Sequence, residues 1–183
     1  MRIAFSGSHR VGKSTLVERV SELLPGYETV DEPYFLLEED GYESAEVPSV
    51  EDFEAQLERS LEALEVGQRD VLFDRCPADV FAYLLEHEDA GAFEPERWLD
   101  RAREAMRTLD LVVFVPIDEG SRIPVPAHED RARRQAVHER LHDLLVEDVL
   151  GFEAEVLAVH GDVRSRIGQV MARIAELERR REG

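Results

Sequence analysis

The stretch GSHRVGKST, residues 7–15, holds the residues best suited to bind phosphate. Gly7, Gly12, Lys13 and Ser14 stand at the fixed places of the spacing G-x-x-x-x-G-K-[ST]. The two glycines let successive backbone N–H groups turn toward phosphate oxygens, and the helix that follows points its positive end at the same oxygens. The lysine reaches the β- and γ-phosphates, and the serine hydroxyl binds Mg²⁺. The stretch, called the phosphate loop below, therefore predicts ATP binding by Gly7, Ser8, His9, Arg10, Val11, Gly12, Lys13, Ser14 and Thr15.

A second candidate lies at the end of the apolar run VLFD, where Asp74 is followed by Arg75. A carboxylate at a strand end beside the phosphate loop can hold Mg²⁺ directly or through water, and the arginine can reach an acceptor or the transferred phosphate. We therefore predict Ser14 and Asp74 as the metal ligands. The alternative is a plain surface turn before a helix that starts at Pro77.

Two other classes of nucleotide-binding protein fit the sequence poorly. GTPases commonly read guanine with an Asn-Lys-x-Asp segment, and this chain has no lysine after Lys13. Mechanical ATPases usually end an apolar strand in Asp-Glu, which Asp118 and Glu119 offer, but Pro116 interrupts that strand just before its end. Too little chain follows for the helical lid of such ATPases. Small-molecule kinases, which use the same loop, remain.

The composition limits the partners. A chain of 183 residues with 43% hydrophobic and 34% charged residues is typical of a soluble protein, and we expect one domain over residues 1–183. A net charge of −19 argues against general binding of nucleic acid. No apolar run is long enough to cross a membrane, and the single cysteine fits a reducing compartment, so we expect a cytoplasmic protein. A homodimer is left open.

Short apolar runs alternate with helical patterns along the chain. Strands are predicted at residues 3–5, 27–30, 71–73, 111–117 and 155–160, and helices around 16–24, 53–64, 78–86, 95–108, 137–145 and 167–177. Because the strands are apolar throughout and do not alternate, they indicate a parallel sheet covered by helices on both faces. The terminal ERRREG is predicted to be a frayed helix end.

Three segments together, GSHRVGKST, DEP and DRCPADVFAYL, resemble the P-loop nucleoside and nucleotide kinases. The similarity is nearest to the nicotinamide riboside kinase-like and deoxynucleoside kinase-like branch, and it covers nearly the whole chain. It implies a three-layer α/β/α fold with a five-stranded parallel sheet in the order 2-3-1-4-5.

The resemblance also implies roles for residues on the acceptor side. Glu32, in DEP, corresponds to the acid after the second strand that orients or deprotonates the acceptor hydroxyl. Asp74 and Arg75 correspond to the acid–arginine pair that ends the third strand. Gln56 matches a glutamine that reads the acceptor base, and its alternative is an exposed helical glutamine. The acceptor-binding residues implied are Glu32, Gln56 and Arg75.

The kinases of this group also carry a mobile lid after the fourth strand, here residues 118–136, whose arginines close over the phosphates. This chain supplies Arg122, Arg131, Arg133 and Arg134 there. Arg131 is favoured first and Arg134 second, because one helical turn beyond the expected hinge of the lid they still face the same way. Arg164, in HGDVRSR, corresponds to a residue that stacks on adenine, and its alternative is an exposed arginine at a helix start. The catalytic residues implied are Lys13, Glu32, Asp74, Arg75, Arg131 and Arg134.

These observations lead to one expected function and two alternatives. We expect an ATP- and Mg²⁺-dependent phosphotransferase that acts on a hydroxyl or phosphate of a nucleoside- or nucleotide-like small molecule. The first alternative is a polynucleotide 5′-hydroxyl kinase, for which the charge of −19 is unfavourable. The second is a regulatory ATPase or nucleotide sensor without kinase activity.

Overall fold

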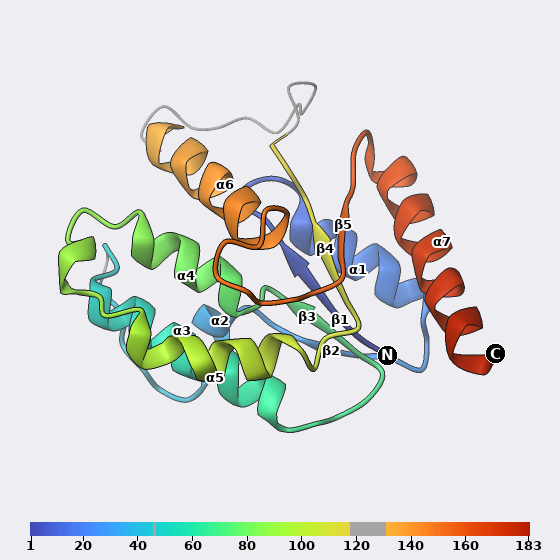
Figure 1. Cartoon of the computed structure of the whole chain (residues 1–183), viewed down its shortest axis with the longest axis horizontal. Coiled ribbons are helices and arrows are strands. Elements are labelled where there is room, and N and C mark those ends of the chain that lie inside the picture. Colours follow the sequence, from blue (N-terminus) through green and yellow to red (C-terminus); the bar gives the residue numbers. More distant parts are fainter. Residues whose placement is uncertain (46, 118–130) are drawn as a thin grey trace.

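A five-stranded parallel sheet forms the centre of the computed structural model, which describes residues 1–45, 47–117 and 131–183 (Figure 1). The strands are β1 (Arg2–Ser6), β2 (Glu28–Val30), β3 (Val71–Asp74), β4 (Leu111–Phe114) and β5 (Val156–Ala158). They lie in the order β2-β3-β1-β4-β5, and every neighbouring pair is parallel. The sheet and the strand order predicted from the sequence are confirmed.

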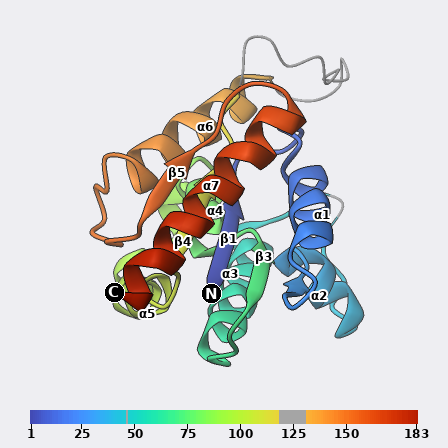
Figure 2. The ribbon, with the colours of Figure 1, turned by 90° about the vertical axis from the view of Figure 1, so that its right-hand side faces the viewer.

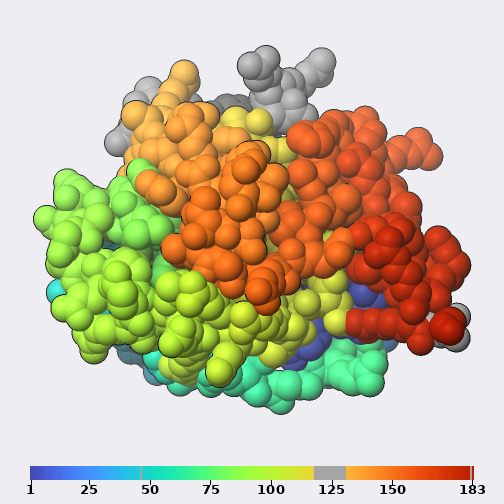
Figure 3. All heavy atoms as spheres, in the orientation of Figure 1, coloured from blue at the N-terminus to red at the C-terminus, as the bar shows by residue number. Residues whose placement is uncertain are grey.

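Helices cover both faces of this sheet. They are α1 (Lys13–Leu23), α2 (Pro33–Glu39), α3 (Val50–Glu65), α4 (Pro77–Leu85), α5 (Glu96–Met106), α6 (Arg131–Leu145) and α7 (Val163–Glu182). A short 3₁₀ turn spans Ala90–Ala92. Figures 1 and 2 show α1 and α7 on one face and α3 to α6 on the other. In Figure 3 the atoms of α6 and of the segment that follows it cover the middle of the molecule, and those of α7 lie at its right-hand side.

The sheet divides the buried apolar residues into two cores. Successive side chains of a strand point to opposite faces, so Ile3 and Phe5 of β1 pack with Leu16 of α1 and Val170 of α7. Ala4, between them in sequence, belongs to the other core, which α3, α4, α5 and α6 complete. The predicted three-layer arrangement is therefore present.

Two elements differ from the sequence prediction. Helix α2 was not predicted; it begins at Pro33, whose ring fixes a helical φ at the first helical position, and it has only seven residues. Helix α7 runs on to Glu182, beyond the residues 167–177 that the periodicity predicted for the closing helix. Arg180 binds Glu176 one turn earlier at 2.6 Å, and Arg181 contacts Asp110 beyond the helix. Cations in the last turn also suit the negative end of the helix.

The topology gathers the candidate functional residues at one edge of the sheet. The carboxyl ends of parallel strands meet at the same edge, where ligands of such sheets bind. The phosphate loop follows β1, Glu32 comes two residues after β2, and Asp74 is the last residue of β3. Since β2, β3 and β1 are neighbours, these three sites lie side by side. None of the helices in the described part of the chain combines the length and apolar character needed to cross a lipid bilayer.

Candidate active site

The conformation of the phosphate loop requires its glycines. A Cβ on Gly7 would lie 2.6 Å from the Val115 carbonyl oxygen, which is too close for any side chain. Gly12 has a φ of 86° and is the last residue before α1, so it adopts the left-handed conformation that glycine favours. The backbone thus turns sharply into the helix, and the N-terminus of α1 faces the pocket.

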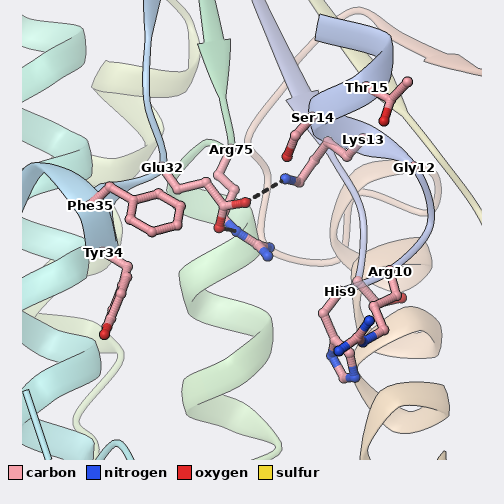
Figure 4. A pocket seen from close by; sticks show the side chains of 11 residues that line it. His9, Arg10, Gly12, Lys13, Ser14, Thr15, Glu32, Tyr34, Phe35 and Arg75 are labelled. Atoms are coloured by element: carbon pink, nitrogen blue, oxygen red, sulfur yellow. Dashed lines mark hydrogen bonds and ion pairs between the residues drawn. The ribbon is translucent and has the colours of Figure 1, made fainter. Parts of the chain in front are cut away.

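A cavity of about 380 Å³ opens in front of this loop (Figure 4). Its lining consists of Ser8, His9, Arg10, Gly12, Lys13, Ser14, Thr15, Glu32, Tyr34, Phe35 and Arg75. Seven of these residues were predicted from the loop, Arg75 was predicted from the end of a strand, and Glu32 was implied by the family resemblance. The structure therefore brings most of the sequence-predicted residues to one pocket.

Lys13 lies between two carboxylates at the base of the pocket. Its ammonium donates to Oε1 of Glu32 at 3.0 Å and also contacts Oδ1 of Asp74. Lys13 is only 4% exposed. Burial acts to raise the pKa of the Glu32 carboxyl, but the cations of Arg75 and Lys13 outweigh it and hold that pKa below its usual value. Glu32 is therefore charged at neutral pH and can accept hydrogen bonds.

Arg75 connects the acid of the pocket with the phosphate loop. Its Nε donates to Oε2 of Glu32 at 2.6 Å, and its Nη1 donates to the Gly7 carbonyl oxygen at 3.2 Å. The guanidinium also lies 5.4 Å from the ring centre of Tyr83, which points its hydroxyl toward the His9 ring at 3.4 Å. Arg75 has a φ of 84°, a conformation that costs about 1–2 kcal/mol for a residue with a side chain. These contacts offset that cost and fix the guanidinium beside Glu32.

Asp79 is a buried residue of the site that the sequence analysis missed. Its Oδ1 accepts from the Gly7 N–H at 3.0 Å and lies 3.4 Å from Nη1 of Arg75, while its Oδ2 accepts from the Cys76 N–H at 3.0 Å. Burial raises the pKa of Asp79, although Arg75 and the Gly7 N–H act in the opposite direction. An acid three residues after a helix cap is the signature of a capping box, and CPAD carries that signal.

Cys76 shares this buried corner. Burial and then the Asp79 carboxylate raise the pKa of the Cys76 thiol well above its ordinary value. A thiol in such surroundings is a poor nucleophile. Cys76 therefore serves as a packed residue of the core and cap.

Two aromatic rings of α2 form the other wall of the pocket, and neither was predicted. The rings of Tyr34 and Phe35 meet edge to face, with centres 5.4 Å apart. Phe35 is 51% exposed although it lines the cavity. An exposed apolar ring beside polar groups is a surface that a ligand can cover. No sequence signal singled out these rings, because α2 itself was not predicted.

The remaining predicted residues lie outside the lining of this cavity. Gln56 is buried on α3, whereas Arg131 and Arg164 are exposed in the first turns of α6 and α7. Arg134 donates to the carbonyl oxygens of His9 and Arg10, so it contacts the loop itself. Of the predicted lid, residues 118–130 with Arg122 and Asp118 lie outside the described residues, and the rest belongs to the first turns of α6.

The polar groups beside Lys13 fit a magnesium ion bound together with phosphates. Ser14 is an exposed residue that lines the cavity, and Asp74 contacts Lys13 from β3. Mg²⁺ commonly takes one or two protein oxygens and completes its shell with phosphate oxygens and water. One hydroxyl and one carboxylate at this place match that requirement.

Comparisons with known proteins agree with this architecture. A family model described as an AAA domain (AAA_28) matches residues 2–166. None of the curated proteins compared with the chain matches it. The deoxyadenosine kinase from M. mycoides with bound dATP superposes with a TM-score of 0.65 at 16% identity, covering 96% of this chain and all 100% of that one.

Two further solved structures are similar over a comparable length. Thymidylate kinase from Candida albicans gives a TM-score of 0.64 at 16% identity, with 96% of this chain and 91% of that chain covered. Shikimate kinase from Aquifex aeolicus gives 0.57 at 15% identity, with 96% and 97% covered. Likeness at such low identity shows the fold. The chain belongs to the AAA domain family AAA_28 and has the fold of the P-loop nucleotide kinases.

Proposed function

We propose that the protein transfers the γ-phosphate of ATP, with Mg²⁺, to a hydroxyl or phosphate of a small nucleoside- or nucleotide-like acceptor. One observation supports this most directly: the Glu32 carboxylate lies 3.0 Å from the Lys13 ammonium in the same cavity. Lys13 belongs to the phosphate side of the site and Glu32 to the acceptor side. An acid placed beside the cation that binds phosphate suits transfer between two bound molecules.

The phosphate side would act through positioning and charge. The N–H groups of the loop and the Lys13 ammonium would hold the β- and γ-phosphates, and Ser14 and Asp74 would hold Mg²⁺, which neutralises charge on the phosphates. Arg75, held by Glu32 and the Gly7 carbonyl, would stabilise the phosphoryl group during transfer. Phosphoryl transfer has a loose transition state, so such positioning supplies most of the catalysis.

The acceptor side would act through Glu32 and the rings of α2. An acceptor hydroxyl that donates to Glu32 would be held in line with the γ-phosphate and would pass its proton to this carboxylate as the new O–P bond forms. The bond between the γ-phosphorus and the oxygen that bridges it to the β-phosphate breaks in the same step, and ADP leaves. Three roles implied by the resemblance remain proposals. Arg131 would close over the phosphates, Gln56 would bind the acceptor, and Arg164 would bind adenine.

The similar structures are kinases of chemically different acceptors. They are a deoxyadenosine kinase, a thymidylate kinase and a shikimate kinase, so this fold serves both nucleoside-type and other acceptors. The exposed ring of Phe35 in the cavity favours an acceptor with a planar ring, because rings stack well on aromatic faces.

A screen of acceptors tests this proposal. Purified protein is incubated with MgATP and with nucleosides, nucleotides, vitamins or 5′-hydroxyl oligonucleotides, and ADP release is measured with mass spectrometry of the product. We expect ADP release to rise with a small nucleoside or nucleotide and to yield a phosphorylated product. In Lys13→Ala this release should fall at least tenfold. Stimulation by oligonucleotides alone would favour a polynucleotide kinase, and hydrolysis that no acceptor changes would favour an ATPase or sensor.

A further inference from the structure

Two arginines from distant helices hold three consecutive carbonyl groups of the phosphate loop. Arg134 of α6 donates from Nε to the His9 carbonyl oxygen at 3.0 Å and from Nη2 to the Arg10 carbonyl oxygen at 3.3 Å. Arg166 of α7 donates from Nη1 to the Val11 carbonyl oxygen at 2.8 Å. Neither arginine lines the cavity. Both arginines therefore contact the backbone of the loop without lining the cavity.

A loop that binds phosphate through its N–H groups must place carbonyl groups elsewhere. Each peptide unit points its N–H and its C=O in nearly opposite directions, so the carbonyls point away from the phosphates. The bond to the Val11 carbonyl is buried, the bond to the His9 carbonyl is partly buried, and the bond to the Arg10 carbonyl is exposed. A buried carbonyl without a donor costs free energy. Arginine is well suited as the donor, because its guanidinium offers several N–H groups in a rigid plane and keeps its charge.

The backbone of this loop has particular need of such support. Arg10 has a φ of 55° and Gly12 a φ of 86°, so the peptide units between His9 and Gly12 have an irregular conformation. Rotation of one of these units would turn a carbonyl oxygen toward the cavity, where it would repel a phosphate. Donors on the carbonyls of His9, Arg10 and Val11 oppose that rotation.

The two arginines hold the loop from both faces of the sheet. Helix α6 lies on one face and α7 on the other, together with α1 (Figures 1 and 2). Arg166 is only 6% exposed, so its guanidinium is held inside the protein next to the loop. Arg134 is partly exposed at the start of α6.

We propose that Arg134 and Arg166 are positioning residues that keep the N–H groups of the phosphate loop turned toward the phosphates of the nucleotide. The proposal rests on nucleotide binding by this loop, which belongs to the proposed function. It assigns to Arg166 a role that the sequence analysis did not identify, and it places Arg134 on the loop backbone. The effect of losing either arginine should grow with the number of phosphates on the nucleotide.

The test compares nucleotides of different phosphate number in the full chain. Dissociation constants for ATP, ADP and AMP are measured by calorimetry for Arg166→Gln, Arg166→Lys and Arg134→Gln, with thermal unfolding as a check of folding. Loss of a charged donor on the loop should raise the Kd for ATP about tenfold or more and the Kd for AMP much less. Arg166→Lys, which keeps one charged donor, should lie between the wild type and Arg166→Gln.

Arg103→Gln provides a matched control. Arg103 of α5 donates from Nε to the Leu150 carbonyl oxygen at 2.8 Å, so it makes the same kind of bond outside the cavity. A role in stability alone predicts that Arg103→Gln and the loop variants lower the melting temperature alike and leave the ratio of the ATP and AMP constants unchanged. The positioning role predicts a changed ratio only in the loop variants.

Two outcomes would overturn the inference in distinguishable ways. If Arg166→Gln and Arg134→Gln are folded and bind ATP like the wild type, while Lys13→Ala loses ATP, the positioning role is wrong and the proposed function stands. If the wild type and Lys13→Ala are equally unable to bind ATP, both fail. Should Arg166→Gln not fold, Arg134→Gln decides alone, since Arg134 is partly exposed.

Discussion

The phosphate loop faces the cavity with backbone and a buried cation, whereas α2 faces it with exposed aromatic rings. Lys13 is 4% exposed and the Gly7 N–H is bound by the fully buried Asp79. Helix α2 has seven residues, of which Pro33 is the buried one, and Phe35 is 51% exposed. The phosphate loop is thus held by contacts with several elements, whereas the aromatic rings lie on a short surface helix.

This difference fits the two tasks that the walls would have. Every nucleoside triphosphate presents the same phosphate chain, so a fixed arrangement of donors suits it. Acceptors differ in shape, and sites for variable ligands are commonly placed on surface segments that a rigid scaffold supports. Glu32 stands at the boundary, because it follows β2, precedes α2 and binds both Lys13 and Arg75.

The largest effect is expected at this boundary, in Glu32→Gln. Loss of a general base lowers the rate by roughly 10²–10⁴-fold, so acceptor phosphorylation should fall by that factor while ATP still binds. Acceptor-dependent ADP release and ATP binding by calorimetry measure the two effects. Asp31→Asn is the matched control, because Asp31 precedes Glu32 and lies outside the lining of the cavity. If Glu32→Gln and Asp31→Asn lowered the rate of acceptor phosphorylation equally, Glu32 would not act as the general base.

A smaller loss is expected in Asp74→Asn. The amide keeps the size of the side chain but loses the charge that would hold Mg²⁺ or its waters, and groups that support a bound metal commonly contribute roughly 10–100-fold to activity. The rate should fall by about that factor, and part of it should return at high Mg²⁺. Asp70→Asn, just before the other end of β3, serves as the control. A rate that no Mg²⁺ concentration changes would contradict the metal role.

Lys13→Ala should weaken ATP binding at least tenfold. Hydrogen bonds to charged groups contribute roughly 1.5–3 kcal/mol each, and this ammonium would contact the β- and γ-phosphates. Calorimetry with ATP measures the loss. Arg19→Ala removes an exposed cation of α1 that binds Glu22 and should leave ATP binding unchanged. Unchanged ATP binding in Lys13→Ala would refute the assignment of the fixed wall to phosphate.

The smallest effect is expected in Phe35→Ala. Aromatic contacts contribute roughly 0.5–1.5 kcal/mol beyond burial, so the KM for the acceptor should rise about 2–10-fold while ATP binding stays the same. Steady-state kinetics with varied acceptor measure this change. Leu23→Ala, which removes an equally exposed apolar residue from α1, is the control. A loss of ATP affinity in Phe35→Ala would mean that the two walls are not separate in function.

Sequence patterns predicted the features that depend on neighbouring residues. The apolar runs marked the five strands, the family resemblance supplied their order, and the loop spacing marked the residues from Ser8 to Thr15 that line the cavity. Helix α2 was not predicted because a short, mostly exposed helix has no repeating pattern of apolar residues. The contact of Arg166 with the phosphate loop was not predicted for another reason. Its partner Val11 lies 155 positions away, so only the folded chain brings the two together.

The lysine of the phosphate loop makes the molecule unusually easy to follow by chemical means. Lys13 carries the only side-chain amine in the sequence, and it lies almost fully buried between two carboxylates. An endopeptidase that cuts after lysine has a single target bond, the one between Lys13 and Ser14. Cleavage of a folded chain proceeds through local opening. The rate of this one cut therefore reports how often the loop opens, and a bound nucleotide should slow it.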